Sequence, residues 1–210
     1  MTQYETDEER LEALKRWWKE NGLSVAVGIA IGLGAIFGWR AWQNYQDGQA
    51  QAASAVFEQL LARAGGGADP AATLELVEQL QDAYGGTPYA ALGSLVAARV
   101  NQVNDRPEAA EQALEQVIAD APDPALARIA ALRLARLLFA RDELDAAAAV
   151  VAEHDDKGAF RGECAAIRGD IAAARGDTEA ARKAYQEALS VGTDQSRLLE
   201  IKLANLPEAG

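Results

Sequence analysis

The chain has 210 residues, and its excess of acidic over basic side chains gives it a net charge of -12. This charge argues against nucleic-acid binding, because proteins hold nucleic acids largely through Lys and Arg on phosphates. Half of the residues are apolar but only 6% are aromatic, and alanine is abundant. This composition favours packed helices over a β-sandwich, since strands prefer β-branched and aromatic residues.

The first twenty residues (1–20) predict a short amphipathic helix. Thr6 and Glu9 have the spacing of a capping box, in which each residue satisfies an N–H group at the helix start. Leu11, Leu14 and Trp18 then fall on one helical face, with charged residues opposite. We expect this head to lie on a membrane surface, and docking to a partner protein is the alternative.

Residues 21–42 predict a transmembrane helix. From Asn21 to Trp39 no residue is charged over 19 positions, a length of about 28 Å, close to the hydrocarbon core of a bilayer. All four tryptophans lie at the two edges of this segment, where amphipathic rings favour the membrane interface. They are Trp17, Trp18, Trp39 and Trp42.

Basic residues on the two sides of this segment predict its orientation. Residues 1–20 contain four, whereas the next twenty after the span contain only Arg40. The positive-inside rule therefore places the N-terminus in the cytoplasm and residues 43–210 outside the cytoplasm. Two alternatives remain at this point: a signal peptide cleaved near Ala50-Gln51-Ala52, and a buried helix of a soluble protein.

Residues 43–210 predict an all-α domain made of helices of about 14–16 residues. No segment alternates apolar and polar residues over a strand's length. Turn signals divide the helices. They occur at 65–70, 85–88, 104–107, 122–124, 141–142, 155–158, 176–177 and 192–193.

The spacing of these signals predicts helical repeats. Ala110, Ala146 and Ala181, aligned as the closest-packing positions, are 36 and then 35 residues apart, near the period of about 34 in tetratricopeptide repeats. The last unit fits best, with Gly169, Gly176, Ala181, Tyr185 and Ala188 at its small, turn and aromatic positions. The unit 88–122 is interpreted as having one inserted turn residue, and the unit 124–158 as having Leu134 at a small-residue position. A generic helical bundle is the alternative.

Stacked repeats expose an inner surface formed by the first helix of each pair, where such folds bind peptides and partner helices. In the helix at 125–140, the candidate partner-binding residues are Arg128, Leu132, Leu138 and Phe139. For the three apolar residues, packing in the core is the competing interpretation.

The sequence offers little for catalysis or cofactor binding. One His and one Cys cannot form the usual zinc sites, and no nucleotide-binding motif is present. His154 and Cys164 could formally act as a pair, but Cys164 falls within a repeat helix, where a small buried thiol is ordinary packing. We therefore expect no catalytic residue, no metal, no cofactor and no small-molecule substrate.

The combination of these features resembles the YfgM family of Gram-negative bacteria. The likeness runs over the whole chain and is most specific at 38–43 (GWRAWQ) after the apolar span, at 168–171 (RGDI) and at Gly176-Asp177. The resemblance implies an ancillary subunit of the SecYEG translocon in the inner membrane. It also implies association with the membrane-anchored periplasmic chaperone PpiD and help in passing emerging proteins to periplasmic chaperones.

Two functional hypotheses follow from the sequence. In the first, the chain is a non-catalytic translocon accessory whose repeat domain contacts chaperones or newly translocated chains. In the second, it is a signalling or regulatory scaffold whose head captures a cytoplasmic regulator. The two hypotheses differ in where partner contacts fall, on residues 43–210 or on residues 1–20.

Overall fold

The computed structural model describes residues 7–66, 69–155 and 158–207, and across these residues the regular secondary structure is entirely helical. The prediction of an all-α fold is confirmed. Thr6, the expected N-cap of the head helix, lies outside the described residues. The chain divides into two compact units, Met1–Gln49 and Ala50–Gly210, and the first helix, α1 (Asp7–Gly65), crosses the boundary between them.

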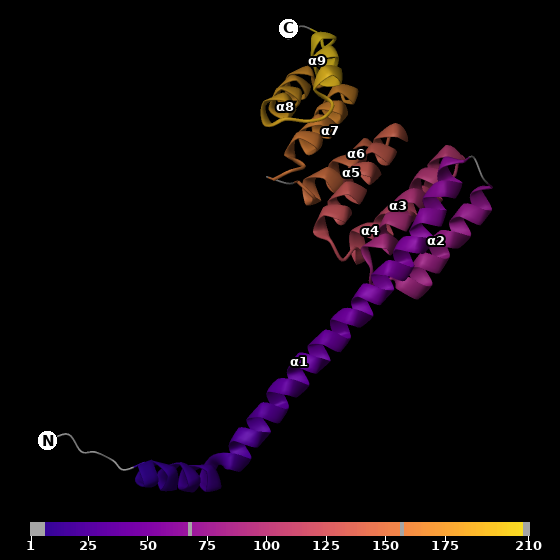
Figure 1. The fold of residues 1–210 in the computed structure, drawn as a ribbon. Coiled ribbons are helices and arrows are strands. Elements are labelled where there is room, and N and C mark those ends of the chain that lie inside the picture. Colours follow the sequence, from indigo (N-terminus) through magenta and orange to yellow (C-terminus); the bar gives the residue numbers. More distant parts are fainter. Residues whose placement is uncertain (1–6, 67–68, 156–157, 208–210) are drawn as a thin grey trace, which may run out of the picture. The chain divides into compact units, whose positions relative to one another are not determined.

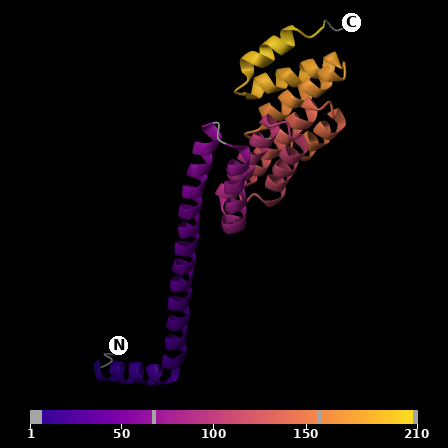
Figure 2. The ribbon, with the colours of Figure 1, turned by 90° about the vertical axis from the view of Figure 1, so that its right-hand side faces the viewer.

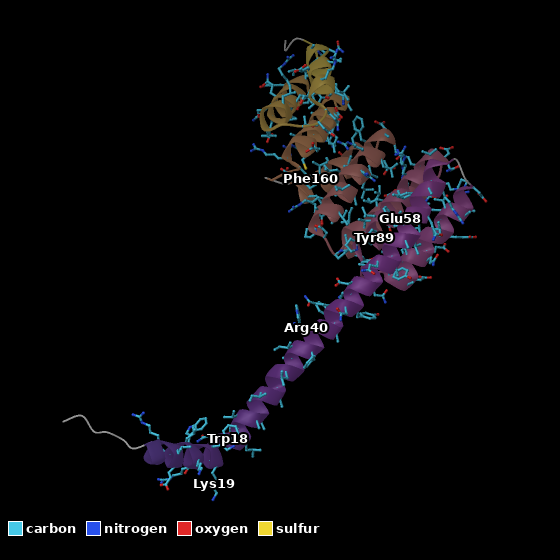
Figure 3. All side chains as sticks on the ribbon, viewed as in Figure 1. Trp18, Lys19, Arg40, Glu58, Tyr89 and Phe160 are labelled. Carbon is cyan, nitrogen blue, oxygen red and sulfur yellow. The ribbon has the colours of Figure 1, made fainter. Side chains whose placement is uncertain are left out.

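In the first unit, α1 bends beside Trp18 and Lys19 (Figures 1 and 3). The amide of Asn21 donates a hydrogen bond of 3.0 Å to the Trp17 carbonyl, and Gly22 lies against the Trp18 indole. Glycine is a common cause of helix bends, because it lacks the side chain that restrains the backbone. The bend separates the charged start of α1 from its apolar segment.

Just beyond the bend lies the apolar segment of α1, where most of the large apolar side chains between Leu23 and Trp42 are exposed. Leu23, Ile31 and Phe37 are between 63% and 80% exposed. Among the described residues, one helix is long and apolar enough to cross a membrane by length and composition, and it contains this segment. Trp39 and Trp42 lie against each other at its far end, with ring centroids 5.1 Å apart and ring planes tilted by 40°.

The second unit begins with the end of α1, and each following helix lies against the next along the chain (Figures 1 and 2). The predicted turn signals separate these helices as expected, but α6 and α9 have 10 and 9 residues, shorter than predicted. The helices are α2 (Pro70–Tyr84), α3 (Pro88–Val103), α4 (Pro107–Asp120), α5 (Pro124–Ala140), α6 (Leu144–Glu153), α7 (Arg161–Ala174), α8 (Thr178–Val191) and α9 (Ser196–Ala204).

Proline and aspartate mark the helix starts. Each helix from α2 to α5 begins with proline, whose fixed φ suits the first turn and whose missing N–H costs nothing there. The carboxylates of Asp69, Asp123 and Asp177 each accept a hydrogen bond from a first-turn N–H of the helix that follows.

Three helix pairs, α3–α4, α5–α6 and α7–α8, are closed by the same turn. In each, one residue adopts a left-handed backbone: Asp105 with φ 56°, Asp142 with φ 62° and Gly176 with φ 77°. The next N–H donates to a carbonyl five residues earlier, in bonds of 2.9–3.0 Å at Arg106, Glu143 and Asp177. This is the Schellman arrangement, which satisfies carbonyls at a helix end.

These turns correct the predicted register. Five residues after each left-handed residue stands a buried alanine, and the second of the three is Ala147, whereas Ala146 is exposed. Ala110, Ala147 and Ala181 are therefore 37 and then 34 residues apart. The α3–α4 turn has no inserted residue relative to the others. The longer first period reflects α5, which has 17 residues against 14 in α7.

The same register places a small residue at the close approach of each pair. Seven residues before the left-handed residue stand Ala98, Ala135 and Gly169, so the prediction of Leu134 at this position was wrong by one residue. In α7–α8 the helices approach so closely that a Cβ built on Gly169 would lie 2.4 Å from the Tyr185 ring. Gly169 therefore leaves the space that Tyr185 fills.

Candidate protein-interaction surface

The four predicted partner-binding residues of α5 separate into two groups. Leu132 and Leu138 are only 7% and 4% exposed and belong to the central core, so they do not line a surface. Phe139 is half-buried against that core, and Arg128 is exposed. The prediction failed for the two leucines because α5 contacts α3, α4, α6 and α7, which cover most of its circumference.

The neighbouring helices leave one stripe uncovered along α3 and one along α5. On α3 it holds Leu92, Val96, Arg99 and Val103, each exposed or half-buried. The corresponding residues of α5, 37 positions later, are Ile129, Arg133, Arg136 and Ala140. The two stripes thus belong to helices that are in direct contact. Sequence reasoning missed these arginines because their register depends on the 37-residue period.

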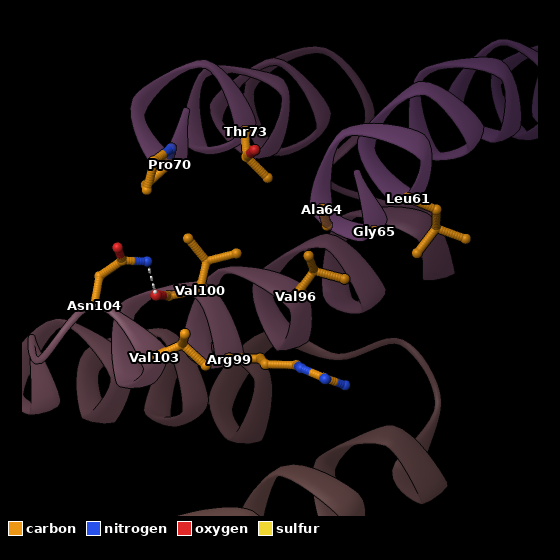
Figure 4. Close-up of a pocket in the computed structure, with 10 residues that line it drawn as sticks. All are labelled: Leu61, Ala64, Gly65, Pro70, Thr73, Val96, Arg99, Val100, Val103 and Asn104. Carbon is orange, nitrogen blue, oxygen red and sulfur yellow. Dashed lines mark hydrogen bonds between the residues drawn. The ribbon is translucent and has the colours of Figure 1, made fainter. Parts of the chain in front are cut away.

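A hollow adjoins the α3 stripe at the ends of α1 and α2 (Figure 4). Its volume is about 630 Å³, and most of its lining is apolar. Val96 and Val100 point from α3 into this space, towards Ala64 and Thr73 (Figure 4). Val103 and Leu61 at its margin are 77% and 48% exposed. The remaining lining residues are Gly65, Pro70, Arg99 and Asn104.

The corresponding position on α7 holds an acidic residue that is already engaged. Asp170 corresponds to Arg136, and its carboxylate accepts hydrogen bonds from Tyr185 at 2.7 Å and from Lys202 at 2.6 Å. Burial raises the pKa of Tyr185 above its usual value, and the hydrogen bond to Asp170 raises it further. The exposed arginines of α3 and α5 thus have no counterpart at this position of α7.

Ion pairs tie α7 to its neighbours. Glu187 of α8 accepts hydrogen bonds from Arg161 at 3.0 Å and from Arg168 at 3.1 Å, and Arg168 also binds Asp155 at 2.8 Å. The hydrogen bond from Arg161, together with Arg168, lowers the pKa of Glu187 below its usual value. These contacts hold the end of the domain together and leave no arginine of α7 uncommitted.

The described part of the chain contains no group of three or more His, Cys, Asp and Glu side chains that could hold a metal ion. Cys164 is buried, and its Sγ lies 3.9 Å from the backbone carbonyl oxygen of His154. Cys164 therefore contacts the peptide group of His154, the arrangement of a packed thiol.

Comparison with known proteins gives consistent matches. A family model described as a tetratricopeptide repeat-like domain matches residues 15–208. A protein of Aggregatibacter actinomycetemcomitans named ancillary SecYEG translocon subunit is 35% identical over 95% of this chain and 97% of its own length. Proteins of the same name from Haemophilus influenzae and Escherichia coli are 35% and 34% identical, over 66% and 69% of this chain and 67% and 68% of their own lengths. No solved structure matches the chain.

Proposed function

This chain belongs to the YfgM family of ancillary SecYEG translocon subunits, and from that membership we propose that it is a membrane-anchored, non-catalytic scaffold of the protein-translocation channel. The observation that carries the proposal is that the family likeness covers the apolar segment of α1 together with the repeats. The chain therefore shares with its relatives both a means of attachment and an interaction domain.

In this proposal residues 21–42 cross the inner membrane, residues 1–20 lie in the cytoplasm, and residues 43–210 lie in the periplasm. The four basic residues before the span, against Arg40 alone after it, support this orientation. The tryptophan pairs at the two ends of the segment support the same depth in the bilayer.

The repeat domain then contacts newly translocated chains and helps to pass them to a periplasmic chaperone of the PpiD kind. Its contact surface is the uncovered side of α3 and α5, where Arg128 and Phe139 lie beside the arginine-bearing stripe. Leu132 and Leu138 support this surface from the core. Anchoring raises the local concentration of the domain for any chain that emerges nearby.

A second candidate function rests on the head. Leu11, Leu14 and Trp18 are 55%, 61% and 56% exposed on one face of α1. A regulatory scaffold could use this face to bind a cytoplasmic protein, while the same face can also lie on lipid headgroups.

Photo-crosslinking in native inner membranes tests the proposal. A photoreactive benzoyl-phenylalanine replaces Val103 on the hollow, Lys183 on the exposed side of α8, or Leu11 in the head, one variant at a time. We expect Val103 to give crosslinks to SecYEG, to translocating chains or to a periplasmic chaperone, and Lys183 to give few. Crosslinks confined to Leu11 and a soluble cytoplasmic protein would refute the translocon proposal and support the regulatory scaffold.

A further inference from the structure

We propose that the face formed by Arg99, Arg133, Arg136 and the adjoining hollow binds an acidic protein segment that carries apolar side chains among its carboxylates. We call this region the arginine face. The inference rests on the proposed function, since it names the chemistry of the partner that the repeat domain recognises.

The first argument is the distribution of charge. Residues 40–210 contain 26 acidic and 16 basic side chains, yet α3 and α5 together hold four arginines and no acidic residue. The neighbouring helices α2 and α4 are different, since each carries several carboxylates. A basic strip in a domain with an acidic excess attracts anionic segments, whereas the acidic remainder of the domain surface repels them.

The second argument is that these arginines are not used for the fold. Elsewhere in the domain Arg141, Arg161, Arg168, Arg175 and Lys202 pair with carboxylates of neighbouring elements. Within the described residues Arg99, Arg133 and Arg136 have no such carboxylate. A guanidinium can bind a carboxylate through two parallel hydrogen bonds, so each of the three can accept an acidic side chain from outside.

The third argument is the hollow beside Arg99. Its 630 Å³ and its lining of Val96, Val100 and the ends of α1 and α2 suit apolar side chains. Arg99 belongs to both features, because it lines the hollow and occupies the position on α3 that Arg136 occupies on α5. Apolar side chains in the hollow and carboxylates on the arginines therefore suit one continuous segment, an amphipathic acidic one.

The test uses the full-length protein in lipid nanodiscs and a fluorescein-labelled amphipathic peptide with leucines on one face and glutamates beside them. A matched peptide has glutamine in place of every glutamate. Fluorescence anisotropy should give saturable, salt-sensitive binding of the glutamate peptide and weaker binding of the glutamine peptide. The variants Arg99→Glu and Arg136→Glu should each weaken binding of the glutamate peptide by about tenfold or more.

Lys183→Glu is the matched control, because it makes the same charge change at an exposed cation of α8. It should leave binding within about twofold of the parent, since long-range charge effects are screened. Val103→Ser removes an exposed apolar side chain at the hollow and should weaken both peptides equally. Arg99→Gln removes the positive charge without reversing it, so it should weaken binding of the glutamate peptide less than Arg99→Glu does. Unchanged helicity of this variant shows that the fold is intact.

Equal loss of binding in Lys183→Glu and Arg99→Glu would overturn the proposal, because net charge alone would then explain the result. Equal affinity for the two peptides would overturn it as well. The proposed function is tested separately by crosslinking in native membranes. Peptide binding that fails while crosslinks to the channel persist refutes the arginine face alone, and peptide binding without those crosslinks refutes the translocon role alone.

Discussion

The pairs α5–α6 and α7–α8 differ at two equivalent positions. At the close-approach position of the first helix, α5 has Ala135 and α7 has Gly169. At the large buried position of the second helix, α6 has Val151 and α8 has Tyr185. The two pairs have the same turn and the same spacing between these positions. A smaller residue on the first helix is thus matched by a larger one on the second. The backbone of the repeat tolerates different side chains as long as the pair fills the same gap.

The exchange has a second consequence in α7–α8. Tyrosine brings a hydroxyl into the interior, and a buried hydroxyl needs a hydrogen-bond partner. Asp170 supplies it, and Lys202 of α9 balances the carboxylate. Polar contacts therefore join the last pair to α9. The pair α5–α6 needs no such contacts, because Val151 has no hydroxyl group. The following predictions test how far the two pairs differ.

The largest expected effect is that of Tyr185→Ala. It removes a side chain that is 2% exposed and leaves a cavity against Gly169, at a cost of about 3–5 kcal/mol of unfolding free energy. Hydrogen exchange followed by mass spectrometry on the full chain should show lost protection in α7, α8 and α9. Val151→Ala is the matched change in α6 and should cost less. Unchanged protection of α8 would contradict the packing described here.

Gly169→Ala tests the other half of the pair. The new Cβ would lie 2.4 Å from the Tyr185 ring, so we expect a loss of about 1–3 kcal/mol in chemical denaturation. Gly93→Ala is the control. Its tightest contact would be with the flexible end of Leu80 at 3.0 Å, and its next contacts, from 3.7 Å, are ordinary van der Waals distances, so it should cost less.

Adding Tyr185→Val to Gly169→Ala copies the residues of α5–α6 and should recover part of the loss caused by the alanine. This double variant is informative because the stability effects of substitutions at residues in contact are not additive. If it is no more stable than Tyr185→Val in an otherwise unchanged chain with Gly169, the two positions do not pack against each other as a pair.

The smallest expected effect concerns pH. The pKa of Glu187 is lowered in the folded chain, so its ion pairs add stability above its usual pKa, and that stability is lost as the pH falls through the lowered value. Glu187→Gln should therefore cost about 0.2–1 kcal/mol at pH 7, the range for exposed pairs, and nearly nothing at pH 2 to 3. Glu115→Gln on the exposed side of α4 is the control, with no expected change at either pH. An equal loss from Glu187→Gln at both values would refute the electrostatic explanation.

The helix boundaries of this fold could be predicted from sequence because they depend on local chemistry. Proline at a helix start and glycine or aspartate after a helix end act within a few residues. The predicted breaks at 104–107, 141–142 and 176–177 are the three Schellman turns. The family resemblance could also be recognised, because it depends on whole segments such as GWRAWQ and RGDI.

The register within the helices could not be predicted, for a physical reason. Residues 146–149 are four consecutive alanines, so no apolar periodicity distinguishes Ala147 from Ala146. The deciding signal is the left-handed backbone of Asp142, and aspartate adopts this conformation only sometimes. An error of one residue in the register then assigns Leu134, in place of Ala135, to the close-approach position.

The assignment of Leu132 and Leu138 to the candidate surface was wrong for a related reason. A helix covered on several sides has few polar residues, so Leu132 and Leu138 could not be distinguished from surface leucines by pattern alone. Two of the exposed arginines, Arg99 and Arg136, occupy corresponding positions 37 residues apart, and this spacing differs from the usual repeat period.

The three Schellman turns also affect how the chain can fold as it is delivered. Each turn is closed by hydrogen bonds that span only six residues, and each pair joins helices that are adjacent in the sequence. Contacts of short sequence separation form quickly, without waiting for distant parts of the chain. A chain that enters its compartment gradually, N-terminal end first, can therefore complete α3–α4 before α7–α8 has arrived. Each finished pair then offers a template for the next, and little apolar surface stays exposed to aggregation during the process.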